Sequence, residues 1–292
     1  MLNFFKILFT PITATLKFIQ TYFKSIVFIT ILFILFADNS TQKLQVANLQ
    51  KIDLNGAIMN SDKIIEQIDN AKKDKNIKGV LLNVNSPGGA VAPSIEISYA
   101  IKELNEIKPV IAYASGTMAS GSYYASIWAS KIIANPGSMI GSIGVIFQGG
   151  NIEQLMKTIG VKTQTVKAGT YKEAGTFTRA WSEAEKKELN GVIQDTYLTF
   201  ISDVANARRL QLKDYKKFAD AHIFTASQAK QVKLIDEVAT LTYAKDQLVK
   251  LSKIKNPIWK KQDKFDQFMD KVIQKTISNI SIYFQANLKA TM

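Results

Sequence analysis

Three short glycine-containing segments carry groups that suit hydrolytic chemistry. They read NSPGG (residues 85–89), ASGTMASGSYYAS (114–126) and KAGTYKEAGTF (167–177). A serine hydroxyl becomes a useful nucleophile only when a neighbouring base takes its proton, and the oxyanion that then forms on the substrate needs hydrogen-bond donors. The middle segment offers serines, the first offers bare glycine backbone, and the third offers lysines.

Composition limits which base is present. The 292 residues include no cysteine, which excludes disulfides, thiol catalysis and cysteine-ligated zinc, and only one histidine, His222. A multi-histidine metal site is therefore excluded, and we interpret His222, within AHIFT, as a partly buried packing residue. A lysine that replaces histidine as the base must lose its charge, which requires burial. Lys172 lies among glycine, threonine, tyrosine and alanine, which suits partial burial.

Ser120 is placed to open a helix that runs to about Ala129. The free N–H groups and the dipole at the start of a helix favour developing negative charge. Gly88 and Gly89 permit positive φ and close backbone approach, so their N–H groups suit an oxyanion site. Position 118 is methionine, so the G-x-S-x-G motif is absent, which argues against the α/β-hydrolase fold.

Strand and helix patterns alternate after residue 43. We expect strands over residues 44–54, 78–84, 109–114, 131–136, 141–147 and 161–166, and helices over residues 61–73, 93–107 and 151–160. Repeated β-α units of this kind predict a largely parallel sheet with helices on its faces.

A long helix is expected to follow, because Ser182 and Glu185 form an S-x-x-E capping box. An apolar stripe along it predicts a core-facing side, made of Leu189, Val192, Ile193, Phe200, Ile201 and Val204. Another helix is expected to begin near Ala226.

The stretch from Phe18 to Ala37 predicts a membrane anchor. As a helix it is long enough for the roughly 30 Å hydrocarbon core, and Lys24 lies off-centre, where its amine can reach the headgroups. Lysines precede the run and Asp38 follows it, so the positive-inside rule predicts a cytoplasmic N-terminus with the rest exported. A cleaved signal peptide is the alternative, although ILFILFADNS has no clear small-x-small site beside the run.

The net charge is +13, from 37 Lys and Arg against 24 Asp and Glu. The lysines are dispersed, and no basic stripe alternates with aromatic residues, so we expect no nucleic-acid partner. In the tail, apolar residues from Phe265 to Phe284 recur at helical spacing. This segment predicts an amphipathic helix that lies on a membrane or a partner subunit, or else packs on its own domain.

In combination and in this order, NSPGG, MASGSYYAS, GSIGV and KAGTYKEAGTFTR resemble the signal peptide peptidase A (protease IV) family of serine proteases, in its short, single-domain form. The resemblance runs from about Gln45 to Val238. It implies an α/β fold related to caseinolytic protease and crotonase, built of repeated β-β-α units. It also implies a Ser-Lys dyad that works without a metal or cofactor.

Carried over position by position, the resemblance makes Ser120 the nucleophile and Lys172 the general base. Ser142 of GSIGV matches the hydroxyl that helps to orient the lysine, and Gly89 matches the oxyanion-hole backbone. One departure lies beside the nucleophile: Ser122 stands where the S-G-G-Y-Y pattern has its second glycine. A second is His222, at a position where the family usually has arginine.

The implied organisation is an anchor region (1–43), a peptidase domain (44–250) and a C-terminal helical extension (251–292). The family implies peptide substrates such as signal-peptide remnants. The charge pattern around the expected anchor predicts a catalytic domain on the outer or periplasmic side of the inner (plasma) membrane. The family further implies a ring-like homo-oligomer, with the serine and lysine of one site drawn from one subunit or from two neighbours. Two other interpretations stay open, a crotonase-type acyl-CoA enzyme and a catalytically inactive membrane scaffold.

Overall fold

The computed structural model describes residues 17–32 and 46–261. The helix over residues 17–32 belongs to one compact unit, and Val46–Lys260 forms another. Within the described ranges, no helix has both the length and the apolar character needed to cross a membrane. The end of the expected anchor (33–37) and the expected tail helix (265–284) lie outside the described residues.

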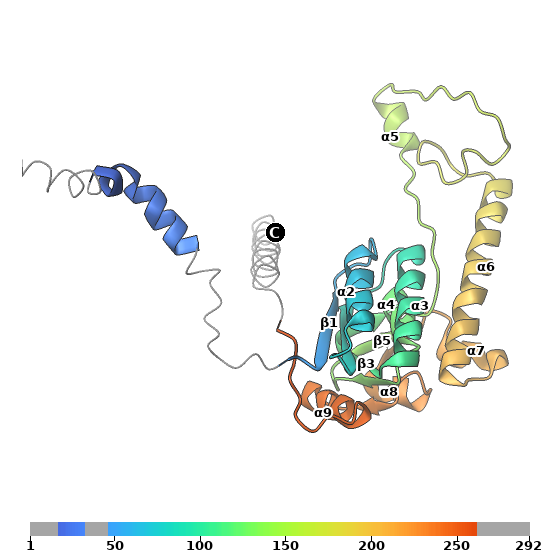
Figure 1. Ribbon diagram of the computed structural model, residues 1–292. Coiled ribbons are helices and arrows are strands. Elements are labelled where there is room, and N and C mark those ends of the chain that lie inside the picture. The colour runs from blue at the N-terminus through green and yellow to red at the C-terminus, as the bar shows by residue number, and fades with distance from the viewer. Residues whose placement is uncertain (1–16, 33–45, 262–292) are drawn as a thin grey trace, which may run out of the picture. The chain divides into compact units, whose positions relative to one another are not determined.

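The unit Val46–Lys260 contains one sheet and its covering helices (Figure 1). The strands are β1 (Leu49–Asn55), β2 (Gly79–Ser86), β3 (Val110–Ala119), β4 (Lys131–Ala134), β5 (Met139–Gly141), β6 (Ile223–Thr225) and β7 (Glu237–Val238). The helices are α2 (Asp62–Lys73), α3 (Val91–Ile107), α4 (Gly121–Ser126), α5 (Glu153–Thr158), α6 (Glu183–Arg208), α7 (Tyr215–Phe218), α8 (Ala226–Gln231) and α9 (Leu241–Leu251), with a 3-10 turn at Leu212–Asp214.

The strand order is β1-β2-β3-β4-β7, and every pair along it is parallel. The long strand β3 pairs with β4 through its first half and with β5 through its second half, where Ala119 lies opposite Gly141. Strand β6 adds to β5 in antiparallel orientation. The expected largely parallel α/β sheet is therefore confirmed.

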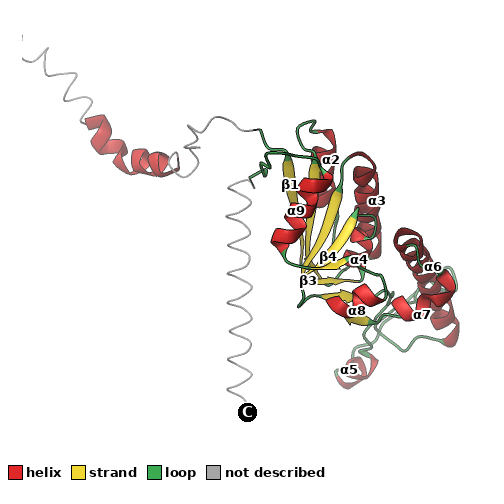
Figure 2. Ribbon diagram, turned by 90° about the horizontal axis from the view of Figure 1, so that it is seen from below, coloured by secondary structure: helices red, strands yellow, loops and turns green. Residues whose placement is uncertain are grey.

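Alternate residues of the central strands build two cores, because successive side chains of a strand point to opposite faces. Val80, Leu82 and Val84 belong to the larger core, which includes buried residues of α2 and α3. Leu81 belongs to a smaller core that includes Leu248 of α9. Figure 2 shows the same arrangement, with α9 on one side of the sheet and α2 and α3 on the other.

Between β5 and α6 the chain leaves the sheet as an extended arm (residues 145–182), which carries α5 (Figure 1). The expected strand at 161–166 lies in this arm and is exposed coil, because no neighbouring strand supplies hydrogen bonds there. The expected strand at 141–147 is likewise wrong beyond Gly141, which ends β5.

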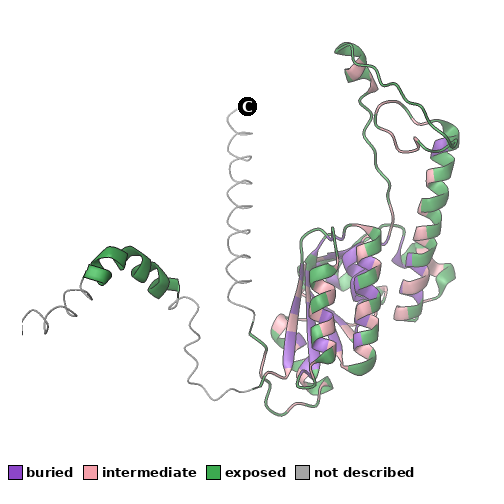
Figure 3. Ribbon diagram, turned by 45° about the horizontal axis from the view of Figure 1, so that its top comes forward, coloured by how far each residue is buried: buried purple, intermediate pink, exposed green. Residues whose placement is uncertain are grey.

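Helix α6 begins at the expected capping box, where Ser182 and Glu185 each bind the other's backbone N–H. The apolar stripe of α6 packs into the core only in the second half of the helix. Ile201 and Val204 are buried there, whereas Val192 in the first half is 62% exposed. The first half extends beside the arm, away from the sheet (Figure 3). His222 is also exposed, so the interpretation as a partly buried packing residue is wrong.

Candidate active site

Ser120 lies in the tight turn between β3 and α4, with φ 53° and ψ −126°. Such a conformation costs a residue with a side chain about 1–3 kcal/mol, so the surroundings must enforce it. The Ser120 N–H donates to the Gly141 carbonyl at 2.7 Å, and the Ser120 carbonyl accepts from the Tyr124 N–H at 3.0 Å. A strained strand-to-helix turn of this kind exposes the nucleophile of other hydrolases, although their G-x-S-x-G motif is absent here.

The glycines of NSPGG let the loop after β2 press against this turn. Gly88 has φ +92°, and a Cβ atom built on it would lie 2.8 Å from the Ser120 Cβ and 2.6 Å from the Gly121 nitrogen. A Cβ on Gly89 would collide with the backbone of Ile58. Both positions therefore exclude any larger residue without movement of the loop.

Two backbone donors flank Ser120. Ile58 donates to the Gly88 carbonyl at 2.9 Å and accepts from Ala90 at 2.7 Å, so the Gly89 N–H takes part in neither bond and points away from Ile58. A Cβ on Gly121 would lie 3.4 Å from the Gly89 nitrogen, which places that nitrogen beside the first turn of α4. The first N–H groups of a helix have no partner within it, so the Gly121 N–H is the second donor.

Ser142 follows β5 directly and has φ 50°, a second strained serine in this region. Its N–H donates to the His222 carbonyl at 2.7 Å, and Ala221 donates to the Ile143 carbonyl at 2.9 Å. These bonds fix the chain on both sides of Ser142. Because Ser142 is bonded to Gly141, which holds the Ser120 N–H, the two serines occupy neighbouring strand ends.

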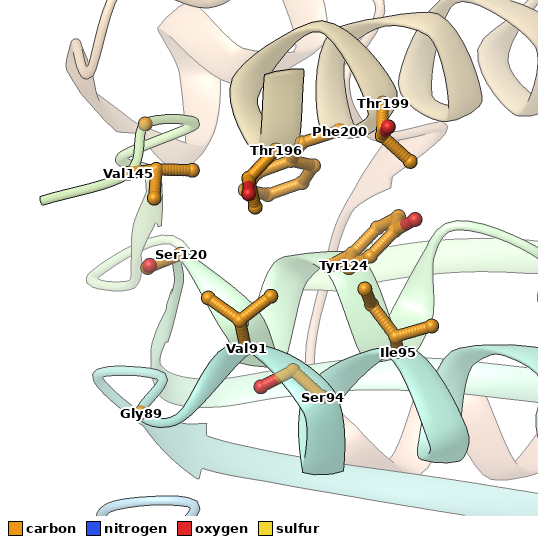
Figure 4. A pocket seen from close by; sticks show the side chains of 12 residues that line it. Gly89, Val91, Ser94, Ile95, Ser120, Tyr124, Val145, Thr196, Thr199 and Phe200 are labelled. Atoms are coloured by element: carbon orange, nitrogen blue, oxygen red, sulfur yellow. The ribbon is translucent and has the colours of Figure 1, made fainter. Parts of the chain in front are cut away.

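A small, largely apolar pocket opens beside Ser120 (Figure 4). Its apolar side chains come from four segments of the chain: Val91, Ile95, Tyr124, Val145 and Phe200. The rings of Tyr124 and Phe200 pack with centroids 4.6 Å apart. Gly89 and Gly121 also line the pocket, so the two backbone donors and Ser120 face the same space.

Lys172 is not part of this cluster within one chain. It is exposed, against the expected partial burial, and it does not line the pocket. It lies on the arm, which projects from the sheet that carries Ser120 (Figure 1). A lysine that acts as a base requires partial burial, and the chain that carries Lys172 does not itself bury this residue.

An ion-pair network fixes the part of the arm that carries Lys172. Arg179 donates to the Glu185 carboxylate at 2.7 and 2.9 Å and to Glu173 at 3.2 Å, and Lys167 donates to Glu173 at 2.6 Å. The hydrogen bonds from Arg179 and from the Ser182 backbone hold the pKa of Glu185 at about 2, well below its ordinary value. Glu173, which follows Lys172 in the chain, is thus linked through Arg179 to Glu185 in the first turn of α6.

The length of α6 separates that network from the pocket. Thr196 lines the pocket, and Glu185 lies eleven residues earlier on the same helix, or about 16 Å at a rise of ~1.5 Å per residue. A lysine side chain spans only about 6 Å. Ser120, Gly89 and Ser142 therefore gather at one end of the sheet, whereas Lys172 is presented elsewhere.

Comparison with known proteins decides the family. The model of peptidase family S49 matches residues 102–255. A protein named as a protease in Methanocaldococcus jannaschii is 40% identical over 66% of this chain, and another in Synechocystis is 36% identical over 66%. A protein named signal peptide peptidase in Enterococcus faecium is 36% identical over 67% of this chain.

The chain belongs to peptidase family S49. The resemblance to signal peptide peptidase A that the motifs indicate is therefore confirmed. The matched S49 region contains Ser120, Ser142 and Lys172, and Gly89 precedes it. The matches span 62%, 70% and 56% of the three relatives' own lengths.

Sequence reasoning on this S49 chain missed the pocket and the arm network. The pocket residues share no periodic pattern, because they come from α3, α4, the arm and α6. Arg179 ends the KAGTYKEAGTFTR motif, but the residues around it do not predict that it binds the Glu185 carboxylate of the next helix. Ser122 was visible only as a departure from the family pattern.

Proposed function

We propose that this protein is a membrane-anchored serine endopeptidase that uses a Ser120–Lys172 dyad. The observation that carries the proposal is the strained Ser120, flanked by the Gly89 and Gly121 N–H groups at the mouth of an apolar pocket. Backbone strain at a partly buried serine calls for a functional reason, and here the strained residue lies beside two backbone N–H groups that can hold an oxyanion. Membership of a peptidase family supports the same chemistry.

In the proposed reaction, the uncharged Lys172 amine takes the proton from Ser120 as its oxygen attacks a peptide carbonyl. The Gly89 and Gly121 N–H groups hold the oxyanion, and one such donor is worth about 2.7–4 kcal/mol. Lys172 then protonates the leaving amine. Water hydrolyses the acyl-enzyme and regenerates the serine, while Ser142 orients the lysine.

The pocket supports a preference for apolar side chains next to the cleaved bond, because its walls are mainly Val91, Ile95, Tyr124 and Phe200. Signal-peptide remnants and other apolar peptides fit this chemistry, and the name of the E. faecium relative points the same way. The apolar sequence from Phe18 to Ala37 would hold the catalytic domain at the outer face of the plasma membrane, with the N-terminus cytoplasmic.

The proposed site is completed between subunits of a ring-like homo-oligomer. Three features of the arm support this: Lys172 is exposed, its loop is fixed by ion pairs, and apolar side chains on the arm face solvent. Those side chains include Ile146, Leu155, Ile159 and Val166, which are 57–104% exposed. Docking on a neighbour would bury both the apolar surface and the lysine. The finer fold type proposed is the caseinolytic-protease/crotonase arrangement, which suits such rings.

The experiment combines labelling with hydrolysis in full-length protein. A fluorophosphonate probe should modify Ser120, and Ser120→Ala and Lys172→Ala should each abolish cleavage of an apolar peptide. The matched controls, Ser115→Ala and Lys162→Ala, should keep activity, because Ser115 binds the Val84 carbonyl and Lys162 is merely exposed on the arm. Cleavage that persists in both dyad variants, or no adduct at Ser120, contradicts the proposal. The second result favours an inactive scaffold.

A further inference from the structure

A buried hydroxyl links the two loops that form the proposed site. Ser122, in the first turn of α4, is fully buried, and its side-chain oxygen accepts a hydrogen bond from the Ala119 N–H at 2.9 Å. A hydroxyl has one proton to donate. The Ser122 oxygen lies 2.7 Å from the Ser86 carbonyl and 2.9 Å from the Ala119 carbonyl, and we assign the proton to the shorter contact. The side chain therefore bridges the residue before the nucleophile to the loop after β2.

This bridge lies where the sheet itself is irregular. Val84 pairs with Ala114, but the next pair along the ladder is Ser86 with Met118, so three residues of β3 bulge out between them. The ends of β2 and β3 are consequently not aligned by a continuous ladder at this point. The hydrogen bond from Ser122 to the Ser86 carbonyl crosses this irregular part of the sheet. It holds the end of β2 beside the end of β3, as a regular ladder bond would.

The bridge continues toward the proposed oxyanion donor. The Ser86 hydroxyl accepts a hydrogen bond from the Gly88 N–H at 3.2 Å, and Gly88 directly precedes Gly89. The path from Ala119 to Ser122, Ser86 and Gly88 is made wholly of buried groups whose hydrogen bonds water cannot replace. It connects Ala119, the residue before Ser120, to Gly88, the residue before Gly89.

We infer that Ser122 is a positioning residue that sets the separation between the Ser120 oxygen and the Gly89 N–H. The inference rests on the proposed function, because it concerns the oxyanion donor of that reaction. Ser122 does not contact substrate. Its loss acts through the loops, and a displacement of about 1 Å between a nucleophile and its oxyanion donor can cost up to ~100-fold in rate.

The test compares Ser122→Ala and Ser122→Gly with Ser126→Ala in the full chain. Ser126 is a matched control, since it is also buried in α4 and its hydroxyl binds only the Ser122 carbonyl of its own helix, at 2.8 Å. Both Ser122 variants should lose about tenfold or more in kcat with KM within about twofold, and Ser126→Ala should stay within about twofold in both. Ser122→Gly removes the same oxygen and introduces the residue that the S-G-G-Y-Y pattern has at this position, so the test still stands if the alanine variant folds poorly.

Hydrogen exchange supplies a readout that needs no turnover. The Ala119 and Gly88 amides should exchange at least about tenfold faster in the Ser122 variants than in Ser126→Ala, because their acceptors are lost or released. Unchanged exchange together with wild-type kcat overturns the inference. If the wild-type protein cleaves no peptide but the Ser122 variants still exchange faster than Ser126→Ala, the proposed function is refuted while the hydrogen-bonded bridge is supported.

Discussion

The Tyr124 hydroxyl donates a 2.5 Å hydrogen bond to the Asp203 carboxylate, which joins helix α4, at whose start Ser120 lies, to the long helix α6. Burial, and then the adjacent Asp203, raise the pKa of Tyr124 far above its ordinary value, so the phenol keeps its proton throughout the physiological range. The Tyr124 ring also lines the pocket beside Ser120. One bond thus holds both a pocket wall and the helix that covers it.

Removal of this hydroxyl should destabilise the fold. Tyr124→Phe should lower the free energy of unfolding by about 1.5–3 kcal/mol, the usual range for a hydrogen bond to a charged group. Denaturant unfolding measures the change. Tyr99→Phe is the control, because the Tyr99 hydroxyl lies 3.4 Å from the same carboxylate and the residue is 42% exposed. An equal loss of unfolding free energy in the two variants would show that the Tyr124–Asp203 hydrogen bond contributes no more to stability than the Tyr99 contact does.

The Glu185 ion pair predicts a pH dependence of stability. The pKa of Glu185 is about 2 in the folded chain against 4.5 ordinarily, so the folded state binds this proton less readily than the unfolded state. Its stabilisation is complete above about pH 4.5 and is lost as the pH falls toward 2. The difference in unfolding free energy between wild type and Glu185→Gln should therefore shrink between pH 5 and pH 3.

Glu188→Gln is the control for this titration, because Glu188 is exposed on the same helix. Its difference from wild type should stay small at every pH in the range. A wild-type advantage over Glu185→Gln that is constant from pH 5 to pH 3 would contradict the assigned pKa and the role of Arg179 in lowering it.

Gly88 should tolerate no side chain. Gly88→Ala places a methyl group 2.8 Å from the Ser120 Cβ, at a φ that disfavours alanine, so the loop must move away from Ser120. We expect a loss of kcat of about 100-fold, measured with an apolar peptide substrate. Gly150→Ala, with no atom within 4 Å of the added methyl group, should leave kcat unchanged. Similar rates in the two variants would show that close packing at Gly88 is irrelevant to catalysis.

Local signals in the sequence predicted the elements well. The Ser182–Glu185 capping box marks the start of α6 because it satisfies the helix's own first N–H groups, whatever the helix packs against. The apolar run before Ser120 likewise predicts β3, whose residues are buried on both faces of the sheet. Ser120, Gly89 and Ser142 come together because parallel strands end at a common edge.

Other expectations failed because they depend on what lies opposite a residue. Val192 fits the apolar stripe of α6, yet nothing in its own chain covers it. The segment 161–166 has strand composition, but a strand exists only beside a partner strand. The exposure of Lys172 has the same origin, because the loop that carries it is held through Glu173 and Arg179 to Glu185 of α6, a contact that the local sequence does not indicate.

In the proposed oligomer a catalytic site forms between two copies of the chain. Ser120→Ala and Lys172→Ala should each be inactive alone, and co-expression of the two full-length variants should restore hydrolysis. In a closed ring with random assembly, roughly a quarter of the sites receive an intact serine from one subunit and an intact lysine from the next. We therefore predict about one quarter of wild-type activity in the mixed oligomer; mixed rings as inactive as either variant alone would contradict the account.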